Sequence, residues 1–125
     1  MNIGIEHIAI YSRNTRRLKE WYEELFGFKT VDDNGKENHF VKADDGSMIE
    51  FVVADSDTQK STLEIEGIGH IAFSVDDFGE MYNKLLKAQV KTVKPISVSE
   101  TGVKTYFFLD PEGNLLHIIS RRQPL

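Results

Sequence analysis

The sequence predicts an α+β fold made of two tandem βαβββ modules, with a curved mixed sheet around a central cleft and the helices on its outer face. An internal repeat predicts the two modules, and one amphipathic helix in each copy predicts the helical layer. The chain has 125 residues and no cysteine, which excludes a disulfide scaffold and thiolate metal sites. We expect a single domain, with a module over 1–54, a linker over 55–66 and a module over 67–125.

The repeat is visible in two stretches of each copy. The hexapeptide that starts at Ile5 returns at Ile68 with the same histidine, isoleucine and alanine at its centre. The turn and strand that lead to Glu50 return in the segment that leads to His117. Such self-similarity indicates that both copies adopt one supersecondary structure.

Each copy contains one helix and four strands. In the first copy, Leu18, Trp21, Tyr22 and Leu25 lie on one face of a predicted helix over 15–26, between an Asn14 cap and a Gly27 stop. Strands are expected over 3–11, 28–32, 38–43 and 47–53, with turns at 33–35 and 44–46. In the second copy we expect a helix that begins near Asp77 and strands over 67–75, 92–98, 104–109 and 114–120.

Charge and hydropathy restrict the partners. Lys and Arg number 15 against 20 Asp and Glu, so the net charge of −5 argues against binding a nucleic-acid backbone. No apolar run approaches the ~20 residues of a membrane span. We therefore expect a soluble cytoplasmic protein that binds neither nucleic acid nor membrane.

Four ionisable residues fall on the faces that the helices leave open. Alternation along the strands places His7, Glu50, His70 and His117 opposite the apolar positions, one in each of four repeat-equivalent strands. Three imidazoles and a carboxylate suit one divalent ion, with Zn or Ni expected first and Co or Fe as alternatives. A lone strand histidine is more often a hydrogen-bonded core residue than a ligand. The fourth histidine, His39, is interpreted as an ordinary strand residue. The joint placement of the four, and the cost of burying Glu50 without a counter-charge, favour a metal centre.

Side chains near these four are candidate substrate contacts. Aromatic strand residues usually belong to a core, so their contribution to a pocket is a weaker prediction than the metal centre. The candidates are Tyr11, Phe40, Ser74 and Phe107.

Over nearly its whole length, the sequence is similar to the vicinal oxygen chelate superfamily. The similarity is carried by residues 5–10, 21–28, 69–75 and 109–117. That superfamily includes glyoxalase I, methylmalonyl-CoA epimerase, extradiol dioxygenases, and the fosfomycin and bleomycin resistance proteins. The resemblance, closest to bacterial glyoxalase I, implies paired βαβββ modules, a homodimer, and His7, Glu50, His70 and His117 as metal ligands.

The resemblance also implies an activity. It implies a metal-dependent lyase or isomerase that acts on a small substrate with neighbouring oxygens through an enediolate-type intermediate. Glu50 and His117 then stand at the catalytic positions. Three positions depart from the glyoxalase I pattern: His117 replaces a glutamate, Tyr11 replaces an arginine that contacts glutathione, and Ala54 replaces an asparagine.

Other activities within the superfamily remain open. A metal-free protein that binds a drug or metabolite would use the same cleft without an ion. An extradiol-type dioxygenase would hold Fe(II) with two histidines and one carboxylate, which His7, His70 and Glu50 could supply. Thiol transfer to fosfomycin would need phosphonate-binding basic residues, which the pattern alone does not identify.

Overall fold

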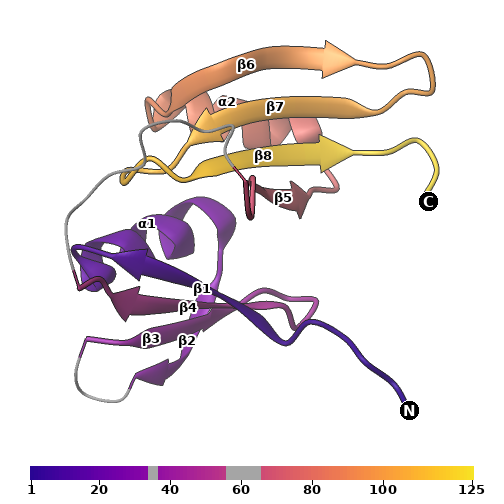
Figure 1. Ribbon diagram of the computed structural model, residues 1–125. Coiled ribbons are helices and arrows are strands. Elements are labelled where there is room, and N and C mark those ends of the chain that lie inside the picture. The colour runs from indigo at the N-terminus through magenta and orange to yellow at the C-terminus, as the bar shows by residue number, and fades with distance from the viewer. Residues whose placement is uncertain (34–36, 56–65) are drawn as a thin grey trace. The chain divides into compact units, whose positions relative to one another are not determined.

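The computed structural model describes residues 1–33, 37–55 and 66–125, which form two compact units, Met1–Thr58 and Gln59–Leu125 (Figure 1). Each unit has the order strand, helix, then three strands, as the repeat predicts. In the first unit the elements are β1 (His7–Ser12), α1 (Thr15–Phe26), β2 (Lys29–Asp33), β3 (His39–Lys42) and β4 (Met48–Val53). In the second they are β5 (Ile71–Ser74), α2 (Phe78–Lys87), β6 (Lys91–Val98), β7 (Lys104–Leu109) and β8 (Leu115–Ser120).

The two sheets have the same topology. Their strand orders are β1-β4-β3-β2 and β5-β8-β7-β6. The first strand of each module runs parallel to the last, and the other pairs are antiparallel. The helix of each module connects its first strand to its second, β1 to β2 and β5 to β6, and these two strands lie at opposite edges of the sheet. The predicted α+β class and the βαβββ modules are confirmed.

Helix α1 forms where the sequence predicts it and is capped at both ends. The side chain of Asn14 accepts a hydrogen bond from the backbone N–H of Arg17 at 3.1 Å. The helix ends at Phe26 and is followed by Gly27, whose φ of 71° is left-handed and favours glycine. Its apolar face packs on the sheet, where the Tyr22 and Phe51 rings lie 5.1 Å apart. Residues Leu18, Tyr22, Leu25, Val41, Ile49 and Phe51 are buried there.

Helix α2 repeats this arrangement in the second unit. The Asp77 side chain accepts a hydrogen bond from the backbone N–H of Glu80 at 2.9 Å and caps the helix, which begins where the sequence predicts. The ring of Tyr82 meets the ring of Tyr106 edge-on at 4.9 Å. Among the described residues of this unit, the buried apolar ones are Phe78, Leu85, Tyr106, Phe108, Leu116 and Ile118.

The first strand of each module is shorter than predicted. Strand β1 starts at His7, because its partner β4 starts at Met48 and residues 1–6 lie outside the sheet. Ile3 and Ile5 are accordingly 86% and 84% exposed. Strand β5 likewise starts at Ile71, so that His70 immediately precedes it. In both modules the apolar alternation of the sequence extends beyond the residues that have a neighbouring strand to pair with, so the sequence predicts too long a strand.

The predicted turn at 44–46 is confirmed, with the backbone N–H of Gly46 donating to the carbonyl of Ala43 at 3.0 Å. The predicted turn at 33–35 and the predicted linker at 55–66 fall largely on residues 34–36 and 56–65, which lie outside the described residues. Within the part of the chain that the structure describes, neither helix is long and apolar enough to cross a bilayer.

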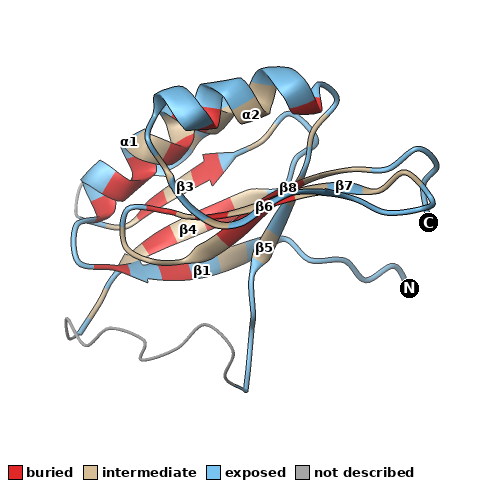
Figure 2. Cartoon of the chain, turned by 90° about the horizontal axis from the view of Figure 1, so that it is seen from above, coloured by how far each residue is buried: buried red, intermediate tan, exposed pale blue. Residues whose placement is uncertain are grey.

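Each sheet therefore has one face under its helix and one face without it. Figure 2 shows the resulting alternation of buried and more exposed residues along the strands of the first sheet. The helix-covered faces carry the predicted apolar positions, and the opposite faces carry the candidate functional residues.

Candidate metal centre

The first unit brings His7 and Glu50 together on the face opposite α1. Glu50 pairs with Ala9 in the parallel β1–β4 register, so its carboxylate lies diagonally across from His7, at the start of β1. The distance between His7 Nε2 and Glu50 Oε1 is 3.7 Å. Two ligand atoms that each lie about 2.1 Å from one ion are roughly 3 to 3.5 Å apart, so this pair fits a shared ion with a small adjustment.

The orientation of His7 is set by a neighbour that the sequence pattern did not single out. His7 Nδ1 lies 2.9 Å from Glu6 Oε1, and a carboxylate accepts the proton of that nitrogen. This hydrogen bond leaves Nε2 facing Glu50 with a lone pair, as carboxylate partners do for metal-binding histidines. The ring of Phe40 packs edge-on against His7 at 5.2 Å.

The second unit brings His70 and His117 together on the face opposite α2. Their ring centroids are 4.7 Å apart, with the rings nearly perpendicular. Phe107 lies beside His117 in the β7–β8 register and stacks on it at 4.3 Å, with an interplanar angle of 14°. His70 meets the edge of the same phenylalanine at 5.5 Å. The aromatic ring therefore holds both imidazoles in place.

His117 is buried in a form suited to metal binding. Burial lowers its pKa, the nearby charge of His70 lowers it further, and the backbone of Ile118 opposes these effects in part. The imidazole is therefore neutral at neutral pH, which is the form that binds metals. Within the described residues, its Nδ1 atom is buried and has no hydrogen-bond partner. A metal ion or a substrate donor would satisfy this nitrogen.

The four predicted ligands thus occur as two pairs, one in each unit. Among the described residues, no group of three His, Cys, Asp or Glu side chains gathers closely enough to hold an ion. The four-ligand set stays a prediction, and the donor chemistry of each pair fits it.

The weaker candidates divide into two kinds. Phe40 and Phe107 lie against the predicted ligands, as described above. Tyr11 is 67% exposed near the end of β1, and Ser74 is the exposed last residue of β5. His39 is 1% exposed on β3, next in sequence to Phe40 and therefore on the opposite face, so it lies outside the centre.

One further residue of this face was not predicted. The ammonium of Lys94 lies 5.1 Å from the centroid of the Phe107 ring, a cation–π contact. Simple alternation from Thr92 would place Lys94 under the helix. The β6–β7 register shifts between these two residues, and this irregularity turns Lys94 to the other face. Irregular pairing of this kind leaves no signal in the strand pattern.

Comparison with known proteins gives related sequences and folds. The uncharacterized protein YwkD of Bacillus subtilis is 30% identical over 116 residues, covering 87% of this chain and 90% of YwkD. The crystal structure of a glyoxalase family protein from Enterococcus faecalis is 29% identical, covers 93% of this chain and 96% of that one, and superposes with a TM-score of 0.77.

Three further proteins are more distantly similar to this chain or match only part of their own length. The fosfomycin resistance protein FosX from Listeria monocytogenes has the same fold, with a TM-score of 0.77 at 18% identity over 96% of this chain and 94% of that one. A mutant of it was solved with Mn(II) and dihydroxypropylphosphonic acid. The chain spans 34% of the 4-hydroxyphenylpyruvate dioxygenase of Tetrahymena thermophila, which it matches at 25% identity over 96% of its own length. It spans 61% of the biphenyl-2,3-diol 1,2-dioxygenase 3 of Rhodococcus globerulus, at 22% identity over 91% of its own length.

The family model described as glyoxalase, bleomycin resistance protein and dioxygenase matches residues 4–118, nearly the whole chain. The match includes both histidine-bearing strand starts and both candidate pairs. The chain therefore belongs to the glyoxalase/bleomycin resistance protein/dioxygenase superfamily.

Proposed function

We propose that the chain is a metal-dependent enzyme of glyoxalase type that isomerises or cleaves a small substrate with two neighbouring oxygens. The observation that supports this best is the occurrence of two ligand-type pairs, His7 with Glu50 and His70 with His117, at equivalent positions of the two modules. A structural role alone does not explain a half-buried acid and three imidazoles on the open faces of two sheets.

One divalent ion per chain is the expected cofactor, held by the four residues together. The donors are three neutral nitrogens and one carboxylate, which suits Zn or Ni first and Co or Fe next. A bound ion would act as a Lewis acid and polarise the neighbouring oxygens of the substrate. It would thereby acidify the C–H bond beside them.

The protein's part of the chemistry is to move one proton between two carbons. Glu50 is our first choice for the base when its carboxylate does not bind the ion, because it is only partly buried and lies beside His7, which Glu6 orients. It would take the proton from one carbon and return it to the next. His117 is the second choice, because burial and His70 lower its pKa and so weaken it as a base. Phe40 and Phe107 flank the two pairs and reduce their contact with water.

The first test is the metal content of protein purified without a metal-binding tag. We expect about one ion per chain, bound natively or after incubation with Zn or Ni. Glu50→Gln and His70→Ala should reduce retention strongly in folded protein. His39→Asn serves as the matched control, because it removes a histidine from the opposite face and should leave retention unchanged.

Three outcomes decide between the proposals. One ion that is lost in both variants supports the four-ligand centre. Two ions per chain with independent affinities would show that each pair binds separately, which contradicts the shared centre. No ion under any condition would contradict the metal proposal altogether and favour a protein that binds a drug or metabolite without metal.

A second candidate activity is extradiol-type dioxygenation. It is favoured by the two dioxygenases among the matched sequences and by the presence of two histidines and one carboxylate in the set. Oxygen uptake with a catechol after loading with Fe(II) would support it. Its absence, together with proton exchange at the carbon beside a carbonyl, would support the isomerase.

The remaining expectation is a homodimer with a small-molecule substrate. Strands β1 and β5 are edge strands of their sheets, and edge strands are usually covered in stable proteins. Sedimentation of the metal-loaded protein would show whether a dimer forms.

A further inference from the structure

The second sheet carries a row of side chains that links the candidate ligand to a cation. Lys94 pairs with Phe107 across β6 and β7, and Phe107 pairs with His117 across β7 and β8. The Lys94 ammonium lies over the Phe107 ring, and that ring stacks on His117. Phe107 therefore separates a positive charge from the imidazole, on the face away from α2.

The backbone places Lys94 in this row through a local irregularity. Thr92 pairs with Phe108 and bonds to the hydroxyl of Tyr106 on the helix side of the sheet. The register then shifts, so that Lys94 faces the other way. A bulge next to a functional site commonly serves to redirect a side chain.

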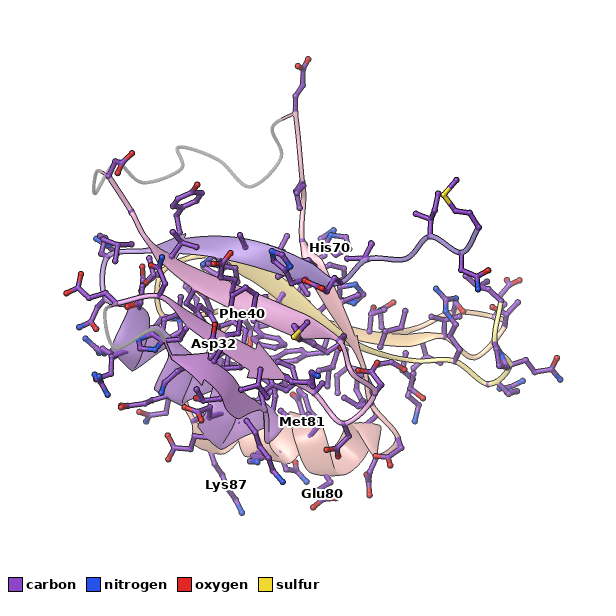
Figure 3. All side chains as sticks on the ribbon, turned by 90° about the horizontal axis from the view of Figure 1, so that it is seen from below. Asp32, Phe40, His70, Glu80, Met81 and Lys87 are labelled. Atoms are coloured by element: carbon purple, nitrogen blue, oxygen red, sulfur yellow. The ribbon has the colours of Figure 1, made fainter. Side chains whose placement is uncertain are left out.

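The fold does not require a lysine at this position. The first sheet has the same row, in which Asp32 pairs with Phe40 and Phe40 pairs with Glu50, and β2 has the same irregularity just before Asp32. Asp32 and Phe40 are labelled in Figure 3, which views the structure from below. The first module has an aspartate at this position and the second has a lysine. The fold therefore does not fix the charge of the side chain, and this charge can contribute to ligand binding.

The ammonium is available to a ligand. Lys94 is exposed, and its ammonium contacts the face of the Phe107 ring. Within the described residues no carboxylate forms an ion pair with it. A cation held over an aromatic ring keeps its outer side open to an anion. The row also sets the distance between the cation and the candidate ligand. Two strand spacings of about 4.8 Å separate the Lys94 and His117 backbones by roughly 10 Å.

We propose that Lys94 binds a carboxylate or phosphate group of the substrate, and that the neighbouring oxygens of the same molecule lie at His70 and His117. Phe107 would contact the carbon atoms between these two ends. The inference rests on the proposed function, and it narrows the substrate class to small anionic molecules that also carry two vicinal oxygens. Lys94 is then a specificity residue, since it binds the substrate away from the reacting carbons.

The test compares three probes that share vicinal oxygens and differ in charge. Glycerol 3-phosphate carries a phosphate, glycerate carries a carboxylate, and glycerol carries neither. Binding is measured on the zinc-loaded protein by calorimetry and by the chemical shifts of the His70 and His117 rings. The zinc content of every sample is measured in parallel, so that loss of metal is distinguished from loss of anion binding.

Three variants isolate the charge. Lys94→Gln removes the ammonium, Lys94→Arg keeps a cation, and Lys104→Gln makes the same charge change at an exposed position at the start of β7. We expect Lys94→Gln to weaken one or both anionic probes by about tenfold or more and to leave glycerol unchanged. Lys94→Arg should retain most of the affinity, and Lys104→Gln should behave like the unaltered protein.

The outcomes separate the two proposals. Preference for glycerol 3-phosphate or for glycerate identifies the anion, and either supports the assignment. Equal affinities in the unaltered protein and Lys94→Gln, or no preference for anionic probes, would overturn it even if zinc is bound as expected. If zinc is absent but anion binding still depends on Lys94, the metal proposal fails and the anion site stands.

Discussion

The hydrogen bond between Thr92 and Tyr106 fixes the strand that carries Lys94, and its removal gives a quantitative test of the fold. The two hydroxyl oxygens are 2.5 Å apart, and Tyr106 is 1% exposed. Thr92 lies at an exposed position of β6, so its hydroxyl can form a hydrogen bond with water when the Tyr106 hydroxyl is absent. The buried phenol has no such alternative.

The two single substitutions should therefore differ. Tyr106→Phe removes a bond and leaves a solvated threonine, at a cost of about 0.5–1.5 kcal/mol. Thr92→Val keeps the β-branched shape but leaves the buried phenol unsatisfied, at a cost of about 1–3 kcal/mol. In the double variant the loss should be close to that of Tyr106→Phe, because no buried hydroxyl remains unpaired.

Urea unfolding of the metal-free protein measures these free energies. A loss of 1 kcal/mol corresponds to a fall of roughly 3–5 °C in Tm for a chain of this size. Thr105→Val is the matched control, since it makes the same change on the opposite face of β7. Additive losses in the double-mutant cycle, or a smaller loss for Thr92→Val than for Tyr106→Phe, would refute the reasoning.

Two other predictions concern the cap of α1 and the loss of stability as the pH is lowered. Asn14→Ala should lower the free energy of unfolding by about 1 kcal/mol, because the backbone N–H of Arg17 loses its acceptor, and an unchanged urea midpoint would contradict this. Because the pKa of His117 is lowered in the folded protein, its imidazole is protonated more readily in the unfolded chain. The free energy of unfolding should therefore fall as the pH drops through the ordinary histidine pKa of 6.5. His117→Gln should lose less stability than the unaltered metal-free protein between about pH 7.5 and pH 5.5, and parallel profiles would show that another group is responsible.

The helices and the helix-covered faces could be predicted because their signals are local. Leu18, Tyr22 and Leu25 follow the helical period, and Asn14 and Gly27 supply the caps at the two ends. Alternation along the strands also predicts the open faces, and this is enough to place His7 and Glu50 on the same face.

The strand starts and the irregular pairings could not be predicted, because they depend on partners distant in sequence. Ile3 and Ile5 continue the apolar alternation, yet β4 offers them no partner. The register shifts before Asp32 and Lys94 reverse the face that alternation assigns. The roles of Glu6 and Lys94 therefore became visible only with the side chains in place.

His117 and Lys94 both make the open face of the second sheet less negative than the equivalent row of the first sheet. In the equivalent row of the first sheet, Asp32 and Glu50 are both acidic residues. A carboxylate at position 117 would lie roughly 10 Å from the anion at Lys94 and would repel it by about 0.5–2 kcal/mol, depending on the effective dielectric. His117→Glu should therefore bind zinc at least as tightly but weaken glycerol 3-phosphate by about two- to thirtyfold, with glycerol unaffected. If the zinc-loaded variant binds the phosphate as well as the unaltered protein does, the neutral imidazole has no part in admitting an anionic substrate.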